Sequence, residues 1–288
     1  MTINKVLVTG SNGFVGMHLC NYLKENGLNV VRNIRKQKYI DVTNIDELLT
    51  INSVDAIVHL AAKTSISDSF KDPAQTYYTN LVGTLNILEF AREKRIKNLI
   101  YISTYVYGQP IYLPVDEKHP LNPHSPYNHS KLLAEKICQS YSHYFGINIV
   151  TLRPFYIYGP NSRNRSLVPS IIKQIKKNGK VKLSGKNVKR DFLFVTDFVY
   201  LIGKILQDFP QGNNIYNVGY GKSCSLNQVA NKLSELFAKK IEIEFSKGTK
   251  PDVTDMLADI KKISKDFKWK PAIDINKGLK FIVQGTHT

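Results

Sequence analysis

The 288-residue sequence is poor in the features that mark several classes of protein. Its three cysteines, Cys20, Cys138 and Cys224, are odd in number and too far apart for a metal-binding spacing. No apolar run reaches the ~18 residues that a membrane span needs, and the N-terminus lacks the apolar stretch of a signal peptide. We therefore expect reduced thiols, no metal site, no membrane association and a cytoplasmic location.

Acidic residues are scarce relative to basic ones. Forty Lys and Arg residues against 23 Asp and Glu residues give a formal net charge of +17 and a pI near 9.6. A domain this basic can bind nucleic acid, but the lysines are scattered along the whole chain, which is also typical of a soluble surface that attracts small anions. We expect this surface to attract small anions and keep nucleic acid as the minor alternative partner.

Short apolar runs alternate with helical patterns in the first half of the chain, which is typical of a parallel sheet with helices on both faces. The predicted strands are 5–9, 29–34, 56–60, 99–102 and 148–152, and the predicted helices are 14–26, 79–95 and 132–144.

The pattern changes after Arg153, where Pro154, Gly159 and Pro160 interrupt the chain. A basic helix over 168–177, strands at 190–195 and 215–218, and a helix at 226–237 follow. We predict an α/β protein with two domains. A doubly wound parallel sheet of the Rossmann type is expected from residues 1–153 plus a return segment at about 191–221. A smaller, discontinuous α/β domain is expected from 154–190 and 222–288.

A glycine-rich segment joins the first predicted strand to the first helix, and it reads TGSNGFVG from residue 9 to residue 16. In this context Gly10 permits a tight turn, Gly13 lets a pyrophosphate approach the backbone, and Gly16 lets helix and strand pack closely. The free N–H groups at the helix start can hold phosphates. The dinucleotide contacts predicted from this turn are Gly10, Asn12, Gly13, Phe14, Val15 and Gly16.

The end of the second predicted strand lacks the acidic residue that NAD-binding proteins usually carry there. The sequence is Val31 to Lys36, VRNIRK, with three cations and no carboxylate. A guanidinium matches the geometry of a phosphate, so Arg32 and Arg35 predict a preference for NADP(H) over NAD(H). The alternative is that these cations are merely solvated. Asp41 is better placed for the adenine edge than for the ribose.

Tyr127 and Lys131 lie four residues apart at the start of a helix, so their side chains share one face. A nearby ammonium stabilises tyrosinate and lowers the pKa of the phenol from about 10 towards neutrality. The tyrosine can then exchange a proton with a sugar hydroxyl while hydride moves to or from nicotinamide. A strand that ends in the hydroxyl residues Ser103 and Thr104 precedes the pair.

Several short motifs occur in the order in which one enzyme family has them. With its glycine segment and its Pro126-Tyr127-x-x-Ser130-Lys131 motif, the chain resembles the extended short-chain dehydrogenase/reductase family. Members of this family use NAD(P) to modify nucleotide-activated sugars. The further motifs are HLAA at 59–62, Asn80 with Gly83-Thr84, VYG at 106–108, LRPF at 152–155, YGP at 158–160, RDF at 190–192 with Val195 and Asp197, and WKP at 269–271.

The resemblance implies roles for many of these positions. It implies that Tyr127 is the acid–base, that Lys131 binds the nicotinamide ribose, and that a Ser or Thr hydroxyl polarises the reacting C–O bond. The first domain is expected to bind NAD(P), and the second a nucleotide-diphosphate sugar. Further expected dinucleotide contacts are Asp41, Val42, Leu60, Ala61, Ala62, Lys63, Asn80, Pro154 and Phe155, and the expected substrate contacts are Ser65, Tyr105, Tyr156 and Arg190.

The catalytic hydroxyl has two candidates. Counting back three residues from Val106, as the family pattern suggests, leads to Ser103. Counting from the strand end leads to Thr104, with one residue deleted before the Val-Tyr-Gly turn. We favour Thr104 because strand register fixes geometry more firmly than a loop does.

The chain departs from the family pattern at three places. Tyr105 stands where the dehydratases carry an Asp-Glu pair, so we do not expect a dehydratase. Tyr156 stands where the epimerases carry Asn, and Lys250 replaces the Arg that usually precedes Pro251, so the nucleotide and the sugar stay undefined.

The missing ribose acid favours exchangeable NADP, and therefore reduction at C4 of a nucleotide-linked 4-keto-6-deoxy sugar. The motif set is close to that of the nucleotide-sugar 4-epimerases, so C4 epimerisation is the alternative. A distant alternative is a non-catalytic dinucleotide- or RNA-binding protein. As in this family, helices 79–95 and 132–144 are expected to pair with their copies in a homodimer.

Overall fold

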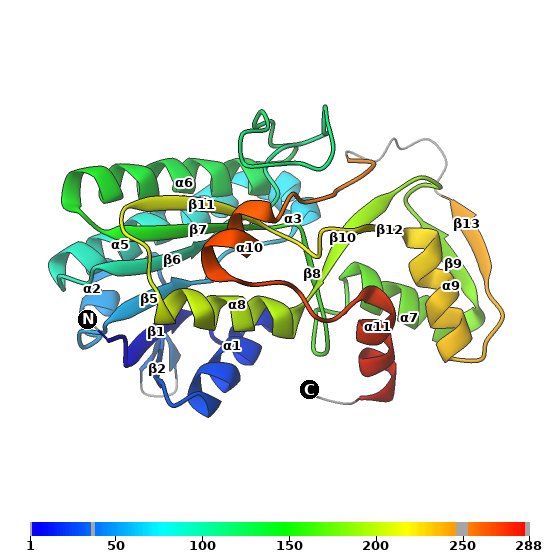
Figure 1. The fold of residues 1–288 in the computed structure, drawn as a ribbon, viewed down its shortest axis with the longest axis horizontal. Coiled ribbons are helices and arrows are strands. Elements are labelled where there is room, and N and C mark those ends of the chain that lie inside the picture. The colour runs from blue at the N-terminus through cyan, green and yellow to red at the C-terminus, as the bar shows by residue number, and fades with distance from the viewer. Residues whose placement is uncertain (1, 36–37, 246–252, 286–288) are drawn as a thin grey trace. The chain divides into compact units, whose positions relative to one another are not determined.

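The computed structural model describes residues 2–35, 38–245 and 253–285 and divides into two compact units (Figure 1). Unit 1 comprises Met1–Tyr107, Leu121–Arg153 and Val199–Tyr216, and unit 2 comprises Gly108–Pro120, Pro154–Phe198 and Asn217–Thr288. The segment that returns to unit 1 is shorter than the expected 191–221. Residues 108–120 belong to unit 2, although the sequence pattern assigned them to the first domain.

Unit 1 contains a six-stranded sheet in the order β11-β7-β6-β5-β1-β2. Strand β1 pairs in parallel with β2 and β5, and β6 pairs in parallel with β5 and β7. The predicted doubly wound parallel sheet is therefore confirmed. Its strands are β1 (Lys5–Thr9), β2 (Asn29–Arg32), β5 (Ala56–His59), β6 (Asn98–Ile102), β7 (Asn148–Pro154) and β11 (Asn213–Val218), and a separate two-stranded hairpin consists of β3 (Ile34–Arg35) and β4 (Lys38–Tyr39).

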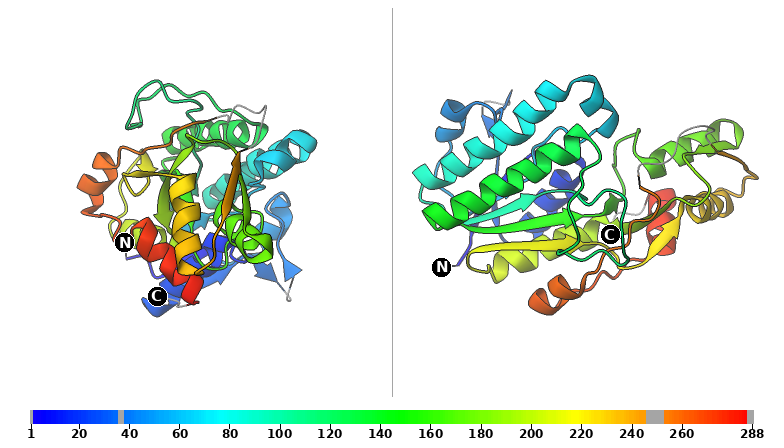
Figure 2. Two further views of the ribbon diagram at one scale, coloured as in Figure 1. Left: turned by 90° about the vertical axis from the view of Figure 1, so that its right-hand side faces the viewer. Right: turned by 90° about the horizontal axis from the view of Figure 1, so that it is seen from above.

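Helices cover both faces of this sheet (Figures 1 and 2). On one face Leu7, Ile57 and Leu99 form a buried core with residues of α2, α5 and α6. On the other face α1 packs beside α8, where the rings of Tyr22 and Tyr200 meet at a centroid distance of 6.3 Å. The helices of unit 1 are α1 (Phe14–Glu25), α2 (Ile45–Leu49), α3 (Ile66–Lys71), α4 (Pro73–Tyr77), α5 (Gly83–Glu93) and α6 (Pro126–Phe145), and α8 (Val195–Gln207) enters it from Val199 onwards.

Two helices differ from the sequence pattern in ways that matter for the site. The predicted helix 79–95 is divided into a π-helical turn, η1 (Tyr78–Val82), and α5. Helix α6 begins at Pro126, six residues before the expected start at 132, because Ser125 caps it by accepting a hydrogen bond from the Asn128 amide (3.2 Å). Tyr127 therefore lies in the first turn of α6.

Unit 2 is a smaller α/β unit with its own core. Strand β10 pairs antiparallel with β12 and parallel with β8, and β9 pairs in parallel with β13. Its strands are β8 (Tyr156–Tyr158), β9 (Lys180–Leu183), β10 (Lys189–Phe194), β12 (Ser223–Ser225) and β13 (Glu242–Phe245), and its helices are α7 (Leu167–Asn178), α9 (Leu226–Leu236), α10 (Lys261–Phe267) and α11 (Ile275–Gln284). Apolar residues of α7, α9, α11 and these strands form the core.

Candidate functional site

The glycine segment forms a tight turn between β1 and α1. Gly10 has φ +67°, and a Cβ atom there would lie 2.8 Å from the Ala61 amide nitrogen, so no other residue fits without strain. A Cβ atom on Gly16 would overlap the Gly10 carbonyl. Gly13 precedes α1, and no side chain caps this helix N-terminus and no acidic residue lies in its first turn. The turn thus presents unneutralised backbone N–H groups of the kind that hold a pyrophosphate.

The predicted ribose-phosphate residues lie at the end of β2. The half-buried Arg32 side chain turns towards α1, where its guanidinium stabilises the thiolate of Cys20 and opposes the rise in the pKa of that thiol caused by burial. The Arg35 side chain lies outside the part that the structure describes. Asp41 is exposed, and its carboxylate accepts a hydrogen bond from the Thr43 amide (2.9 Å).

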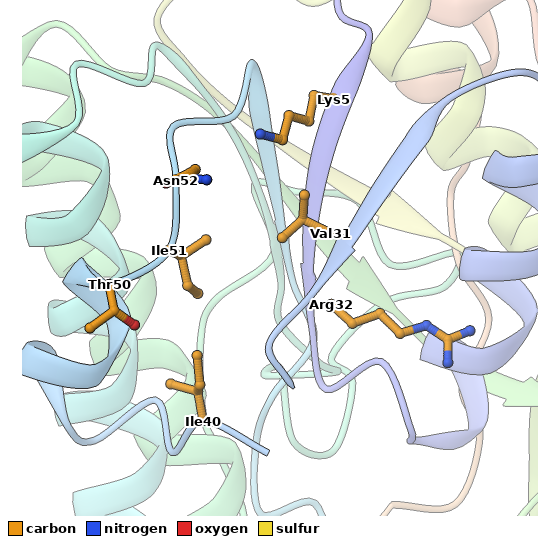
Figure 3. Close-up of a pocket in the computed structure, with 7 residues that line it drawn as sticks. All are labelled: Lys5, Val31, Arg32, Ile40, Thr50, Ile51 and Asn52. Atoms are coloured by element: carbon orange, nitrogen blue, oxygen red, sulfur yellow. The ribbon is translucent and has the colours of Figure 1, made fainter. Parts of the chain in front are cut away.

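A cavity of about 260 Å³ adjoins β2, and Figure 3 shows Arg32 directed away from its other lining side chains. Lys5 opens β1, whereas the glycine turn follows the last residue of that strand, so the cavity is distinct from the predicted dinucleotide turn. The lining residues are Lys5, Val31, Arg32, Ile40, Thr50, Ile51 and Asn52.

The segment after β5 is held beside the glycine turn. The amides of Leu60 and Ala61 both donate to Thr9 Oγ1 (3.2 Å each), which fixes the backbone that approaches Gly10. Ala62 is partly exposed, and Lys63 is exposed. The next predicted contact, Ser65, caps α3 by accepting from the Asp68 amide (3.2 Å), so its hydroxyl has a structural partner.

Asn80 connects this segment to α6. Its side chain forms two hydrogen bonds with the Lys63 backbone, to N–H (2.8 Å) and to C=O (3.0 Å), and donates to Ser130 Oγ (2.9 Å). Asn80 lies in the π-helical turn η1, a conformation that is frequent at functional sites. The buried Val42 side chain packs on Gly83, where a Cβ would come within 2.7 Å of it.

Tyr127 and Lys131 occupy the first two turns of α6, as the sequence predicts. Tyr127 is partly exposed, whereas Lys131 is 2% exposed and its Nζ lies 4.2 Å from the centroid of the Tyr101 ring. Burial lowers the pKa of Lys131 to about 7, and the Cys138 and Glu135 side chains act in the opposite direction. The amine thus titrates near neutrality and can respond to a charge that arrives beside it.

The two candidate hydroxyls have different surroundings. Ser103 is 3% exposed, and its Oγ donates to the carboxylate of Glu135. Thr104 is partly exposed. Since the Ser103 hydroxyl already has a buried partner, these surroundings favour Thr104 as the hydroxyl open to a ligand. Tyr105, predicted to contact substrate, is only 2% exposed and packs edge-on against Tyr107.

A buried ion pair lies behind Ser103. The Glu135 carboxylate, one turn beyond Lys131, binds the Arg153 guanidinium through Nη2 (2.6 Å) and Nε (3.0 Å). The other Arg153 nitrogen, Nη1, donates to Tyr107 Oη (2.8 Å). The network joins the ends of β6 and β7 to α6. It therefore fixes the position of the Ser103–Thr104 segment relative to the helix that carries Tyr127.

The remaining predicted contacts belong to unit 2. Pro154 ends β7, and Phe155 is 6% exposed and donates through its amide to Val218 O (2.9 Å). Tyr156 Oη accepts from the Leu167 amide (3.0 Å), and burial raises the pKa of its phenol. Arg190 Nη1 donates to the carbonyls of Lys189 (2.7 Å) and Val253 (3.1 Å), so it is partly engaged by its own unit.

Several buried polar residues around the site were given no role by the sequence analysis: Thr9, His59, Thr84, Glu135 and Arg153. Each is at most 4% exposed. All of these except Glu135 lie within the quoted motifs, but a motif does not reveal which distant side chain a buried polar residue contacts.

Two further findings concern residues 2–35, 38–245 and 253–285. Within these ranges no helix has both the length and the hydrophobicity needed to cross a bilayer. The same part of the chain contains no group of three or more His, Cys, Asp or Glu side chains arranged to hold a metal ion.

Comparison with known proteins agrees with this geometry. The family described as "NAD dependent epimerase/dehydratase family" matches residues 6–219. A putative UDP-glucose 4-epimerase of Methanocaldococcus jannaschii is 32% identical, over 96% of this chain and 97% of that protein. A GDP-6-deoxy-D-mannose reductase of Pseudomonas aeruginosa is 30% identical, over 97% of this chain and 96% of that protein.

Among solved structures, that of RMD from Pseudomonas aeruginosa complexed with NADPH is similar to this chain, with a TM-score of 0.90 and 28% identity over 98% of both chains. The family match covers most of the chain, including the glycine turn and the Tyr127–Lys131 pair. The predicted family resemblance is confirmed: the chain belongs to the NAD-dependent epimerase/dehydratase family.

Proposed function

We propose that the protein is an NADP(H)-dependent reductase that acts at C4 of a nucleotide-linked 4-keto-6-deoxy sugar. The observation that carries the proposal is the pairing, within unit 1, of an uncapped glycine turn with the Tyr127–Lys131 pair on α6. The first feature fits the pyrophosphate of a dinucleotide, and the second fits proton transfer to a sugar oxygen. A reductase of a GDP-linked 6-deoxy sugar is among the relatives.

The residues of unit 1 divide the chemistry between them. When bound, the dinucleotide supplies the hydride that adds to C4 of the ketosugar. Tyr127 donates its phenolic proton to the C4 oxygen, so that the carbonyl becomes a hydroxyl. The Lys131 ammonium stabilises the tyrosinate that remains, and Thr104 donates a hydrogen bond to the C4 oxygen. Leu60 to Lys63, Val42 and Asn80 contribute to the dinucleotide site.

The preference for NADP(H) rests on the end of β2. No carboxylate is available there for a ribose hydroxyl, and the buried Nε of Arg32 has no hydrogen-bond partner among the described residues. The charge and planar geometry of a guanidinium at this strand end suit a 2′-phosphate better than a ribose hydroxyl. NADPH binding tighter than NADH binding, measured by fluorescence titration, is the expected result, and the reverse order would contradict the preference.

We assign the nucleotide diphosphate to Arg190 and Tyr156, and part of the sugar to Ser65 and Tyr105. Arg190 supplies the positive charge, and the planar fork of a guanidinium suits the oxygens of a diphosphate. A screen of nucleotide diphosphates by thermal shift, repeated on Arg190→Ala, tests the assignment. Loss of the shift in the variant is expected, and an unchanged shift would contradict it.

The reaction is tested with NADPH and a panel of nucleotide 4-keto-6-deoxy sugars. Stoichiometric loss of NADPH absorbance with formation of the 4-hydroxy sugar is expected. Tyr127→Phe is expected to lower kcat about 10²- to 10⁴-fold, the range for loss of a general acid, with NADPH affinity unchanged. Unaltered turnover in this variant would rule out the proposed mechanism.

C4 epimerisation is the second candidate, favoured by a relative described as a putative UDP-glucose 4-epimerase. The same residues would then remove and return a proton while the dinucleotide stays bound. Exchange between C4 isomers without added cofactor, together with NAD that co-purifies with the protein, distinguishes this reaction from reduction.

We also propose a homodimer formed through α5 and α6. Tyr144 and Phe145, at the end of α6, are 73% and 45% exposed, which is a large apolar area for a surface helix. Light scattering at working concentration is expected to report twice the 32.7 kDa chain mass, and a clean monomer would contradict the proposal.

A further inference from the structure

A chain of buried hydrogen bonds crosses unit 1 from the glycine turn towards α6. It begins at Thr9, the residue before Gly10, whose Oγ1 lies 2.7 Å from Nδ1 of His59. The other ring nitrogen of His59, Nε2, lies 3.2 Å from Thr84 Oγ1 on α5. All three side chains are at most 1% exposed, so water cannot replace these bonds.

The neighbouring bonds determine which tautomer the histidine adopts. Thr84 Oγ1 donates its only proton to the Asn80 carbonyl (2.6 Å), so it can only accept from His59. Nε2 of His59 therefore carries the proton, and Nδ1 accepts the proton of Thr9. The lone pairs of Thr9 Oγ1 are then free to accept from the Leu60 and Ala61 amides, as they do.

The chain continues from Asn80 to the tyrosine. The Asn80 side chain donates to Ser130 Oγ (2.9 Å), and Ser130 Oγ donates to the carbonyl of Tyr127 (2.8 Å). In each of these hydrogen bonds the donor has a proton to give and the acceptor has a lone pair to receive it. The imidazole ring thus connects the Thr9 strand end to Thr84 and, through the Asn80 carbonyl, to η1, and the Asn80 side chain connects η1 to the start of α6.

We propose that His59 is a positioning residue that, as the neutral Nε2–H tautomer, holds the dinucleotide turn through Thr9 and the Tyr127 turn of α6 through Thr84 and Asn80. This inference rests on the proposed function, because it assigns the two ends of the chain to dinucleotide and proton transfer. Burial and the Lys131 charge lower the pKa of His59 to about 3, which keeps the ring neutral at physiological pH.

Two substitutions each keep one of the two hydrogen bonds of the His59 ring and remove the other. In His59→Asn the side-chain oxygen can take the place of Nδ1 and accept from Thr9, but nothing reaches Thr84. In His59→Gln the side-chain N–H can take the place of Nε2 and donate to Thr84, but no acceptor remains for Thr9. The full-length protein serves in each case, with NADPH as the probe.

The two variants are expected to fail in different ways. His59→Gln weakens NADPH binding about tenfold, the effect of one buried hydrogen bond, and leaves the Tyr127 titration in place. His59→Asn leaves the NADPH Kd near the wild-type value and moves the Tyr127 titration by at least about half a pH unit. The titration is read from tyrosinate absorbance as the difference between each protein and the same protein carrying Tyr127→Phe.

His119 is a matched control, because it is a buried histidine of unit 2 that also bonds through both ring nitrogens, to the Ile111 amide (3.0 Å) and the Pro120 carbonyl (2.9 Å). His119→Gln and His119→Asn are expected to lower thermal stability without moving either readout. If the His59 variants do not fold, Thr84→Val removes the hydrogen bond between His59 Nε2 and Thr84, and it is expected to move the Tyr127 titration.

The outcomes separate the inference from the proposed function. Equal losses in both readouts for His59→Asn and His59→Gln, or no change in either, would mean that His59 only fills the core and would overturn the inference. A wild-type protein that binds neither NADPH nor NADH would overturn the proposed function, and the inference with it.

Discussion

The two units use their buried polar residues in different ways. In unit 1 they bond to backbone groups but also to one another across elements, as Glu135 of α6 does with Ser103 and with Arg153 of β7. In unit 2 they bond to backbone: the Asp191 carboxylate accepts from the amides of Tyr220, Gly221 (3.0 Å) and Ala258 (3.1 Å). Bonds between side chains fix the relative orientation of functional groups, whereas bonds to backbone fix the course of loops.

This difference leads to separate expectations for the two units. Loss of Glu135 or His59 from the buried networks of unit 1 is expected to disturb dinucleotide binding or proton transfer as well as stability. A substitution at Asp191 is expected to loosen the loops of unit 2 and leave the properties of unit 1 unchanged. The following variants test this distinction, beginning with the largest expected loss of stability.

Glu135→Ala is expected to be the most damaging of these substitutions. It leaves the Arg153 guanidinium, whose side chain is 4% exposed, without a counter-charge, and breaking a buried pair in this way costs about 3–5 kcal/mol of unfolding free energy. Urea denaturation measures the loss, and NADPH titration is expected to weaken in parallel.

Glu235→Ala is the control for Glu135→Ala, because it removes one partner of the Lys232–Glu235 pair (2.9 Å), in which the Glu235 side chain is 67% exposed. Exposed pairs contribute little to stability, so no measurable loss is expected. Equal effects of the two substitutions would show that the buried pair has no special role.

Asp191→Ala removes the acceptor of three buried amides in unit 2. Leaving such groups unsatisfied is expected to cost about 3 kcal/mol, measured by urea denaturation, while the NADPH Kd measured on the folded protein stays at the wild-type value. A large change in NADPH affinity would contradict the separation of the two units.

The pH dependence of stability is expected to have opposite signs for the two units. The pKa of His59 is about 3 in the folded protein and about 6.5 when unfolded, so the unfolded state binds the extra proton and stability falls as pH decreases from 6.5 to 3. Burial raises the pKa of Asp191 to about 6 from 3.8, so its contribution is present at low pH and is lost as pH rises through 6.

His59→Gln is therefore expected to reduce the slope of the unfolding free energy against pH in this acidic range, by up to about 1.4 kcal/mol per pH unit. Asp191→Asn is expected to steepen it between pH 3.8 and 6. Unfolding free energies measured at intervals across this range check both signs, and identical pH profiles for the two variants would refute the assignment.

Ser103→Ala and Thr104→Ala compare two neighbouring hydroxyls and are expected to have the smallest effects on stability. Ser103→Ala removes one buried hydrogen bond to Glu135 and is expected to cost about 1 kcal/mol of stability with kcat nearly unchanged. Thr104→Ala is expected to leave stability unchanged and to lower kcat about tenfold or more. If Thr104→Ala leaves kcat intact, Thr104 is not the catalytic hydroxyl.

Features confined to a short stretch of sequence could be predicted. The glycine turn, with its positive φ at Gly10, and the Tyr127–Lys131 pair on one helix face depend on neighbours a few residues away. The Tyr127–Lys131 spacing indicated a helix that starts near Tyr127, in agreement with the structure, whereas the apolar pattern alone placed the start of α6 too late, at residue 132. The π-helical turn at Asn80 has no sequence signature that separates it from the α-helix that follows.

The buried networks could not be predicted, because their partners are far apart in the chain. Thr9 and His59 are separated by 50 residues, and Ser103 and Glu135 by 32. The contact between Ser103 and the Glu135 carboxylate, which supports our proposal of Thr104, is likewise one that no counting from a motif reveals.

The sequence by itself determined the family, the parallel sheet and the positions of the turn and the tyrosine–lysine pair, because these follow from local pattern and periodicity. Only the tertiary structure decided the surroundings of Lys131, the partner of Ser103 and the tautomer of His59. Those properties depend on burial and on side chains that distant strands and helices bring together, and the free energy of a buried polar group is set by the partners that surround it.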